Sequence, residues 1–169
     1  MKLTILGTGN AMVTKCYNTC FAIEKDGHYF LVDGGGGNTI MKQLKDADID
    51  WREITDVFVT HKHVDHIMGI IWIIRLFGQN IAEKGLEREL NIYGHEEVIH
   101  ILHSMAELLL QKKHCDAIGK QIHMIKVKDG ESRQILGQKV TFFDIQSTKA
   151  KQFGFSMDLG DDEKLTCCG

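Results

Sequence analysis

The sequence has no proline, only five scattered cysteines, little net charge and no apolar run long enough to span a bilayer. The odd number and the spacing of the cysteines argue against a disulfide framework. The adjacent pair Cys167 and Cys168 would chelate one ion poorly, so we treat them as free thiols. No stretch resembles a signal peptide, and we expect a cytoplasmic protein with no membrane partner. A net charge of −3 gives no general attraction to nucleic acid, so RNA binding would need a local basic patch.

The composition that remains is that of one soluble globular domain, which we expect to span residues 1–169. Apolar runs separated by glycine and aspartate turns predict strands, helix, strand, helix, strand, helix and then a run of strands. This order predicts an α/β or α+β layered protein. The expected strands are 2–6, 19–24, 28–32, 57–59, 90–93, 122–127, 132–136, 139–145 and 153–159, and the expected helices are 38–47, 67–77 and 95–113.

Four side chains of the kind that bind metal ions fall within six residues, in the turn between the strand 57–59 and the helix that follows. They are His61, His63, Asp65 and His66. Imidazole and carboxylate together suit a borderline divalent ion such as Zn²⁺, with Mn²⁺ and Fe²⁺ as rivals. His61 and His63 point the same way in extended backbone and can hold one ion, and Asp65 and His66 can face a second. Two ions about 3.5–4 Å apart can polarise a phosphoryl or carbonyl oxygen and hold a hydroxide between them.

Simpler explanations of the histidines have less support. A solvated, histidine-rich turn is disfavoured because the cluster lies between two buried elements. A structural zinc site is disfavoured because such sites are closed by four ligands rich in cysteine, and no cysteine lies near. His100 and His103 share a helix face and could form another metal pair, but no third ligand is evident there.

Two glycine-rich segments follow predicted strands. Residues 7–10 form a Gly-x-Gly turn, which we interpret as a tight turn because the third glycine of a dinucleotide fingerprint is missing. Residues 34–37 are four consecutive glycines after Asp33. Glycine allows positive φ and close approach of the backbone to other elements, so we expect this run to be a site-shaping loop, with a flexible linker as the alternative.

Four stretches, in the right order along the chain, resemble the metallo-β-lactamase superfamily and, within it, the ribonuclease Z group of metal-dependent hydrolases. The most specific is 58–69, which resembles the superfamily signature His-x-His-x-Asp-His. The others are the opening strand and loop at 6–19, the strand and glycines at 31–36, and the strand, loop and strand at 143–155. Together they cover nearly the whole chain.

This resemblance implies an αββα sandwich with two zinc ions at the edge of the sheets. His61 and His63 would hold the first ion, and Asp65 and His66 the second. A bridging hydroxide, oriented or deprotonated by Asp65, would attack a phosphodiester. Asp33 would support the metal site from outside the ligand set. In the ribonuclease Z group the substrate is the 3′ trailer of precursor tRNA, so the resemblance implies an RNA or other phosphodiester substrate and a role in tRNA processing.

The chain also departs from the family pattern. Gln146 and Ser147 stand where the family has His-Ser, whose histidine is the third ligand of the first ion. The family's bridging aspartate and final histidine would follow later than Gly169, so we expect an incomplete sandwich that lacks its C-terminal part. The alternative to a hydrolase is therefore a catalytically inactive half-domain that self-associates, because an uncovered sheet edge and apolar face would need a partner. A homo-oligomer is expected, and lactonase or thioesterase chemistry also stays open.

Overall fold

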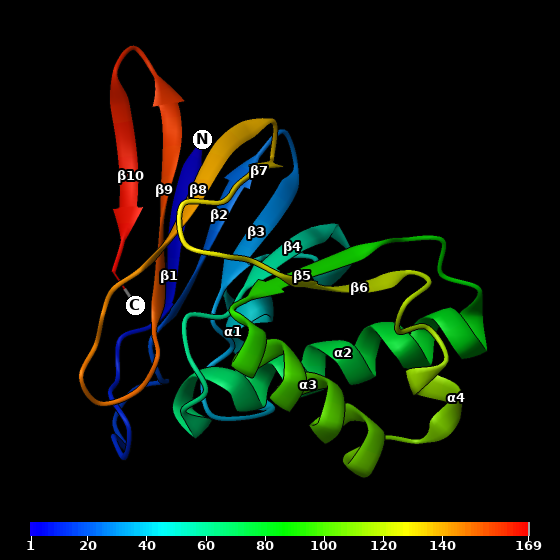
Figure 1. Ribbon diagram of the computed structural model, residues 1–169. Coiled ribbons are helices and arrows are strands. Elements are labelled where there is room, and N and C mark those ends of the chain that lie inside the picture. Colours follow the sequence, from blue (N-terminus) through cyan, green and yellow to red (C-terminus); the bar gives the residue numbers. More distant parts are fainter. Residues whose placement is uncertain (169) are drawn as a thin grey trace.

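A computed structural model describes residues 1–168, which form two β-sheets and a layer of helices (Figure 1). The larger sheet has the order β1-β2-β3-β4-β5-β6, in which β1 to β3 pair antiparallel and β3 to β6 pair parallel. Its strands are β1 (Lys2–Gly7), β2 (Cys20–Lys25), β3 (His28–Val32), β4 (Ile54–Phe58), β5 (Leu90–Gly94) and β6 (Ile122–Lys126).

The register of the parallel strands decides which loops meet. Val32 of β3 pairs with Phe58 of β4, and Phe58 pairs with Tyr93 of β5. The carboxyl ends of the three strands therefore lie side by side, at the edge of the sheet where open α/β proteins place their sites. The residues that follow these strands include Asp33 and His61, which are separated by 27 intervening residues in the sequence.

The helices lie on one face of the larger sheet (Figure 1). They are α1 (Thr39–Asp46), α2 (Val64–Lys84), α3 (Glu96–Leu109) and the short α4 (Lys112–Cys115), with a 3₁₀ turn at Trp51–Glu53. The prediction of a buried helix after the histidines is confirmed, although α2 is longer than expected at both ends. It ends at Gly85, whose φ of 62° gives the left-handed cap that commonly stops a helix.

The predicted single helix over 95–113 is wrong, because the chain breaks between α3 and α4. Leu110 is extended, with φ −101° and ψ 158°. The break lets α4 turn back against α2, where His114 is buried. A Cβ on Gly78 of α2 would lie 2.2 Å from the His114 carbonyl oxygen, so this contact is between backbones. Such a long-range contact leaves no local signal in the sequence.

The second sheet covers the opposite face of the larger sheet. It is antiparallel with the order β10-β9-β8-β7, and its strands are β7 (Ser132–Ile135), β8 (Gln138–Asp144), β9 (Phe153–Gly160) and β10 (Glu163–Cys167). Aromatic rings fill the space between the sheets. Phe58 lies 5.1 Å from Phe142, and Phe30 lies 5.4 Å from Phe155, between ring centroids. A separate apolar core lies between the larger sheet and the helices.

The outer face of the second sheet carries no helix within residues 1–168, so the layers are helix, sheet and sheet (Figure 1). Four hydroxyl side chains form a row across it, one from each strand, in the order Ser132, Thr141, Ser156 and Thr166. The outer two pairs are within hydrogen-bonding distance, at 2.8 Å and 3.3 Å. The expected uncovered apolar face is therefore wrong for this sheet, whose exposed side is polar.

Apolar exposure is found instead on the edge strand β1. Leu3 is 49% exposed and Ile5 is 56% exposed. They pair with Ile23 and Phe21 of β2, and Ile23 belongs to the core between the sheets. Leu3 and Ile5 thus continue that core to an open edge. In the part of the chain that the structure describes, no helix is long and apolar enough to cross a membrane.

Candidate metal centre

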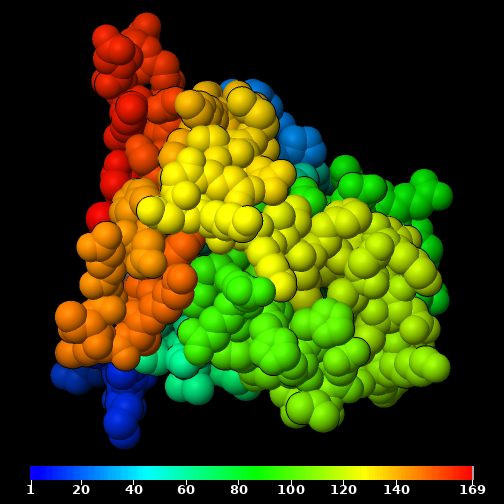
Figure 2. All heavy atoms as spheres, viewed as in Figure 1, coloured from blue at the N-terminus to red at the C-terminus, as the bar shows by residue number. Residues whose placement is uncertain are grey.

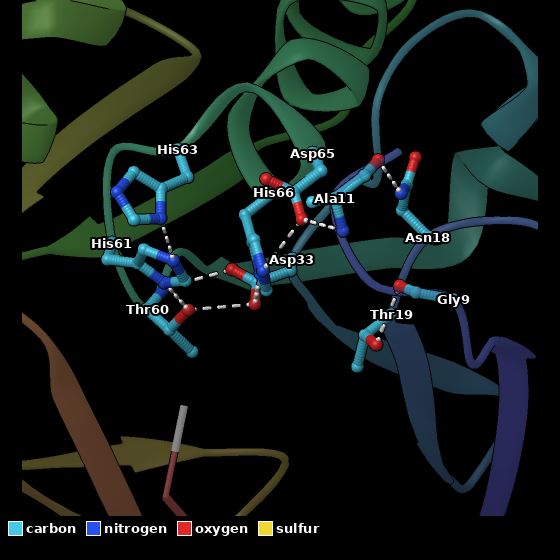
Figure 3. A network of polar contacts seen from close by, with 10 residues as sticks. All are labelled: Gly9, Ala11, Asn18, Thr19, Asp33, Thr60, His61, His63, Asp65 and His66. Carbon is cyan, nitrogen blue, oxygen red and sulfur yellow. Dashed lines mark hydrogen bonds and ion pairs between the residues drawn. The ribbon is translucent and has the colours of Figure 1, made fainter. Parts of the chain in front are cut away.

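The four ligand-type side chains leave the end of β4 together (Figure 3). After β4 the backbone continues through buried Thr60 to His61, which is 3% exposed. His63 is extended, with ψ 147°, and is the N-cap of α2. Asp65 then falls in the first turn of the helix, where its negative charge is stabilised by the helix dipole. The strand-to-helix turn expected from the sequence is confirmed.

The two histidines closest to the strand converge through their ring nitrogens. His61 Nε2 lies 3.0 Å from His63 Nδ1. On the other side of the loop, His66 Nε2 lies 3.6 Å from Asp65 Oδ2. Two donors bound to one tetrahedral zinc at about 2.1 Å would be roughly 3.4 Å apart. Both pairs are close to that separation, so the donor types and their spacing fit two borderline divalent ions, with two protein ligands each.

Asp33 joins the two halves of the loop from the neighbouring strand. It follows β3, is 4% exposed and has φ +57°. Its carboxylate accepts hydrogen bonds from the Thr60 backbone N–H at 2.9 Å and from the Thr60 hydroxyl at 2.8 Å. It also lies 2.7 Å from His66 Nδ1. The family resemblance predicts that Asp33 supports the site from outside the ligand set. Its contacts with Thr60 and His66 agree with that position.

These contacts determine which nitrogen of each ring is free. His66 Nδ1–H donates to Asp33, which leaves Nε2 without a proton. The Thr60 hydroxyl donates its proton to Asp33. At 2.8 Å it therefore accepts a hydrogen bond from His61 Nδ1–H, which leaves His61 Nε2 without a proton. Each freed Nε2 faces its neighbouring ligand. Thr60 was not identified from the sequence, although it directly precedes His61.

Burial and local charge set the protonation of the histidines. Burial, together with the positive charge of His66, lowers the pKa of His61 to about 4. A neutral imidazole is the form that binds a metal ion. Burial also acts to lower the pKa of His66, but the hydrogen bond and the negative charge of Asp33 outweigh it and raise that pKa.

The loop after β1 supports Asp65. The backbone N–H of Ala11 donates to Asp65 Oδ2 at 2.8 Å, and Asn18 Nδ2 holds the Ala11 carbonyl at 3.0 Å (Figure 3). Thr19 Oγ1 bonds to the Gly9 carbonyl in the same loop. The tight turn predicted at 7–10 therefore begins a longer loop that reaches Asp65 of the candidate metal centre. Ala11 carries no side-chain chemistry, so only the fold could identify it.

The glycine loop is packed against α2, which excludes the flexible linker, and its role in shaping a site stays a prediction. The Gly34 N–H donates to the His66 carbonyl at 2.8 Å, and the Gly69 N–H donates to the Gly35 carbonyl at 2.9 Å. A Cβ on Gly69 would lie 1.8 Å from the Gly34 carbonyl oxygen, so this approach requires glycine. The Tyr17 hydroxyl lies 2.7 Å from the carbonyl oxygens of both Gly34 and Gly37.

Gln146 lies in the loop after β8, exposed and with φ +57°. Its backbone N–H donates to Asp144 Oδ1 at 2.8 Å. Within residues 1–168 no three His, Cys, Asp or Glu side chains are grouped closely enough to hold one ion. His103 Nδ1 lies 3.4 Å from Glu107 on the same helix.

Comparison with solved structures identifies the fold. The chain aligns over 100% of its length with 69% of human tRNase Z, short form, at a TM-score of 0.74 and 19% identity. It also aligns over 97% with 61% of the metallo-β-lactamase fold protein YhfI from Bacillus subtilis, at a TM-score of 0.71 and 18% identity. A diphosphatase from the PhnP family gives a TM-score of 0.70 at 19% identity, over 92% of this chain and 61% of that one. The fold is that of the metallo-β-lactamase superfamily.

The family follows from sequence comparison. The family model described as Anti-Pycsar protein Apyc1 matches residues 1–168, and the chain belongs to this family. Curated relatives confirm the resemblance to ribonuclease Z. The enzyme of Methanococcus maripaludis strain C6 is 36% identical over 106 residues, 62% of this chain and 32% of that one. The enzyme of Borrelia hermsii is 32% identical over 127 residues, 75% of this chain and 39% of that one. The chain thus spans about a third of the length of the curated relatives it matches.

Proposed function

We propose that this chain provides the metal-binding part of a metal-dependent phosphodiesterase of ribonuclease Z type. The observation that carries the proposal is the convergence of His61 Nε2 with His63 Nδ1, and of His66 Nε2 with Asp65, with both Nε2 atoms freed by Thr60 and Asp33. We assign His61 and His63 to one zinc ion and Asp65 and His66 to a second. Bound zinc supplies Lewis-acid polarisation of the phosphoryl group and activation of the attacking water.

The protein's own groups have defined roles in this reaction. Asp65 Oδ2 is held by the Ala11 N–H, so its other oxygen is free to orient the attacking water and accept its proton. Asp33 keeps the His66 ring in one orientation and one tautomer. We therefore propose Asp65 as the catalytic residue and Asp33 as a positioning residue.

The substrate class comes from the relatives. Because the curated relatives are named ribonuclease Z, we propose RNA as the substrate class. We also extend to this chain the anti-Pycsar role that the family description names. The free cysteines of the described residues are typical of a reducing compartment, and we propose a cytoplasmic location. A panel of phosphodiesters, with linear RNA among them, and of lactones and thioesters would separate phosphodiesterase from ester hydrolase activity.

Zinc content per chain after dialysis tests the proposal directly, with bis(p-nitrophenyl) phosphate hydrolysis measured on the same sample. About two zinc ions per chain and hydrolysis that is lost on chelation are expected. Replacing Gln146 by histidine should raise zinc affinity by about tenfold or more, since loss of even an outer partner of a ligand costs about 10–100-fold. The control Ser147→His places the same ring one residue further along and should leave the affinity unchanged. Near-zero zinc in the wild-type chain and in Gln146→His would contradict the proposal.

A second candidate function is an inactive half-domain that self-associates, and a specific observation favours it. Leu3 and Ile5 extend the inter-sheet core to the unpaired edge of β1, where a second copy could cover them. Light scattering should then give a mass above that of one chain. Ile5→Lys should return it to the monomer mass, whereas Lys2→Glu on the same strand should not. A monomeric wild-type chain would exclude this homo-oligomer.

A further inference from the structure

A cavity lies at the same edge of the larger sheet as the candidate metal centre. It has a volume of about 390 Å³ and lies at the N-terminal end of α3. The residues that line it are His95, Glu96, Glu97, His100, Lys126 and Lys151. They come from the N-cap and first turns of α3, from the end of β6 and from the loop at 145–152, which also carries Gln146. Figure 2 shows this loop, in orange, beside the green atoms of α3 and below the yellow segment that follows β6.

The backbone N–H groups at the N-terminus of α3 have no hydrogen-bond acceptors among the described residues. His95 is the N-cap, and its side chain makes no capping hydrogen bond. The backbone N–H groups of Glu96, Glu97 and Val98 have no hydrogen-bond partner among residues 1–168. α3 is 14 residues long, so its dipole places partial positive charge at this end. Free N–H groups at the start of such a helix are a recognised arrangement for binding phosphate.

The acidic side chains at the cavity are already paired. Glu96 lies 2.9 Å from Lys126, and Glu97 lies 2.5 Å from Lys62. The hydrogen bond from its lysine lowers the pKa of each glutamate. Lys151 is less engaged, since its ammonium lies 3.9 Å from Asp144. Its charge remains available to a ligand.

A buried and unpaired histidine points independently to a ligand at this position. His95 is 1% exposed and lines the cavity, yet neither ring nitrogen has a partner of normal hydrogen-bond geometry within residues 1–168. The backbone of Lys151 lies near enough to the ring to act on its pKa, but this contact falls short of a hydrogen bond. A buried polar group without a partner costs about 1–3 kcal/mol, which a ligand or a bridging water would recover. Burial lowers the pKa of His95, so the neutral ring has one N–H to donate.

We propose that this cavity is a phosphate-binding subsite, in which the α3 N–H groups, Lys151 and His95, directly or through one water, hold a phosphate of the substrate. It would be a phosphate other than the one that is cleaved, as in an extended phosphodiester chain. The choice of a substrate phosphate rests on the proposed function. The binding of phosphate itself rests on the cavity alone.

The test is a titration of the ¹⁵N-labelled full chain, freed of metal by a chelator, with inorganic phosphate at constant ionic strength. The amide signals of Glu96, Glu97 and Val98 should shift and saturate. Lys151→Ala should weaken this binding about tenfold, the scale of one charge-assisted hydrogen bond. The control Lys149→Ala removes an exposed lysine from the same loop and should leave it unchanged. No saturable shift at these amides, a shift confined to residues 61–66, or equal weakening by both variants would overturn the proposal.

His95→Phe keeps a ring against Phe153, which lies 5.4 Å from the His95 ring between centroids, and removes both nitrogens. It should weaken phosphate binding severalfold, and unchanged affinity in the folded variant would remove His95 from the site. If this variant does not fold, Lys151→Ala decides the question. Acetate that shifts the same amides as strongly as phosphate would overturn the phosphate assignment. Zinc content and hydrolysis are measured separately, so failure of the proposed function can be distinguished from failure of this subsite.

Discussion

Replacing Asp33 by asparagine tests whether one buried carboxylate fixes the ring tautomers in the segment 60–66, which we call the metal loop. An asparagine of the same shape keeps an amide oxygen for the Thr60 backbone N–H. It also places an NH₂ group where Asp33 Oδ2 now faces the Thr60 hydroxyl and His66 Nδ1. To avoid two facing donors, His66 must present a bare Nδ1 and carry its proton on Nε2. The nitrogen that faces Asp65 would then be unable to bind a metal ion.

The magnitude follows from the two contacts that change. Hydrogen bonds to a charged group contribute about 1.5–3 kcal/mol each, and the new amide donor recovers part of the loss. We expect the free energy of unfolding to fall by about 2–4 kcal/mol. Zinc affinity should fall by about 10–100-fold, the usual effect of removing the partner of a ligating histidine. Zinc binding at the proposed Asp65 and His66 site should be affected more than zinc binding at the proposed His61 and His63 site.

Urea unfolding of the metal-free protein, followed by circular dichroism, measures the first quantity, and competition with a chromogenic chelator measures the second. The matched control is Asp56→Asn, which alters another buried carboxylate of the same sheet, bonded to Tyr93 and Asn91 rather than to the metal loop. This control should leave zinc affinity unchanged. A folded Asp33→Asn protein with wild-type zinc affinity would refute the reasoning.

Two further predictions concern stability. Gly69→Ala should lower the free energy of unfolding by about 3 kcal/mol or more, because its Cβ would lie 1.8 Å from the Gly34 carbonyl oxygen. Gly37→Ala, whose Cβ meets nothing within 4 Å, should be nearly neutral by the same urea assay, and equal losses would contradict the packing argument. Burial raises the pKa of Asp56, so the folded state binds its proton more tightly. The resulting stabilisation is full below about pH 3.9 and is lost as pH rises through the folded-state pKa. Asp56→Asn should therefore gain stability relative to wild type as pH rises above about 4, and a constant difference between the two would count against this.

The sequence predicted the strand-to-helix turn at 61–66 well because its geometry is local. A His-x-His pair in extended backbone, followed by an acid and a histidine in the first helical turn, places its side chains by spacing alone. β1 to β9, α1, α2 and the start of α3 were predicted from apolar periodicity, which reflects burial that the fold then supplies. β10 was not predicted, because its side chains are mostly exposed and give no such pattern. The interruption between α3 and α4 was missed because it depends on the packing of His114 against Gly78.

The sequence by itself therefore determined the kind of chemistry this chain could support, through the residue types and spacing of His61, His63, Asp65 and His66. Only the tertiary structure decided which ring nitrogens are free. The hydrogen bonds that fix them join Asp33 to Thr60 and His66 across two parallel strands, and the register of β3 and β4 brings those residues together. The same sheet edge places the N-terminus of α3 beside the metal loop. Contacts between residues so far apart in the chain arise from strand pairing, and a local pattern in the sequence does not reveal which strands pair or in what register.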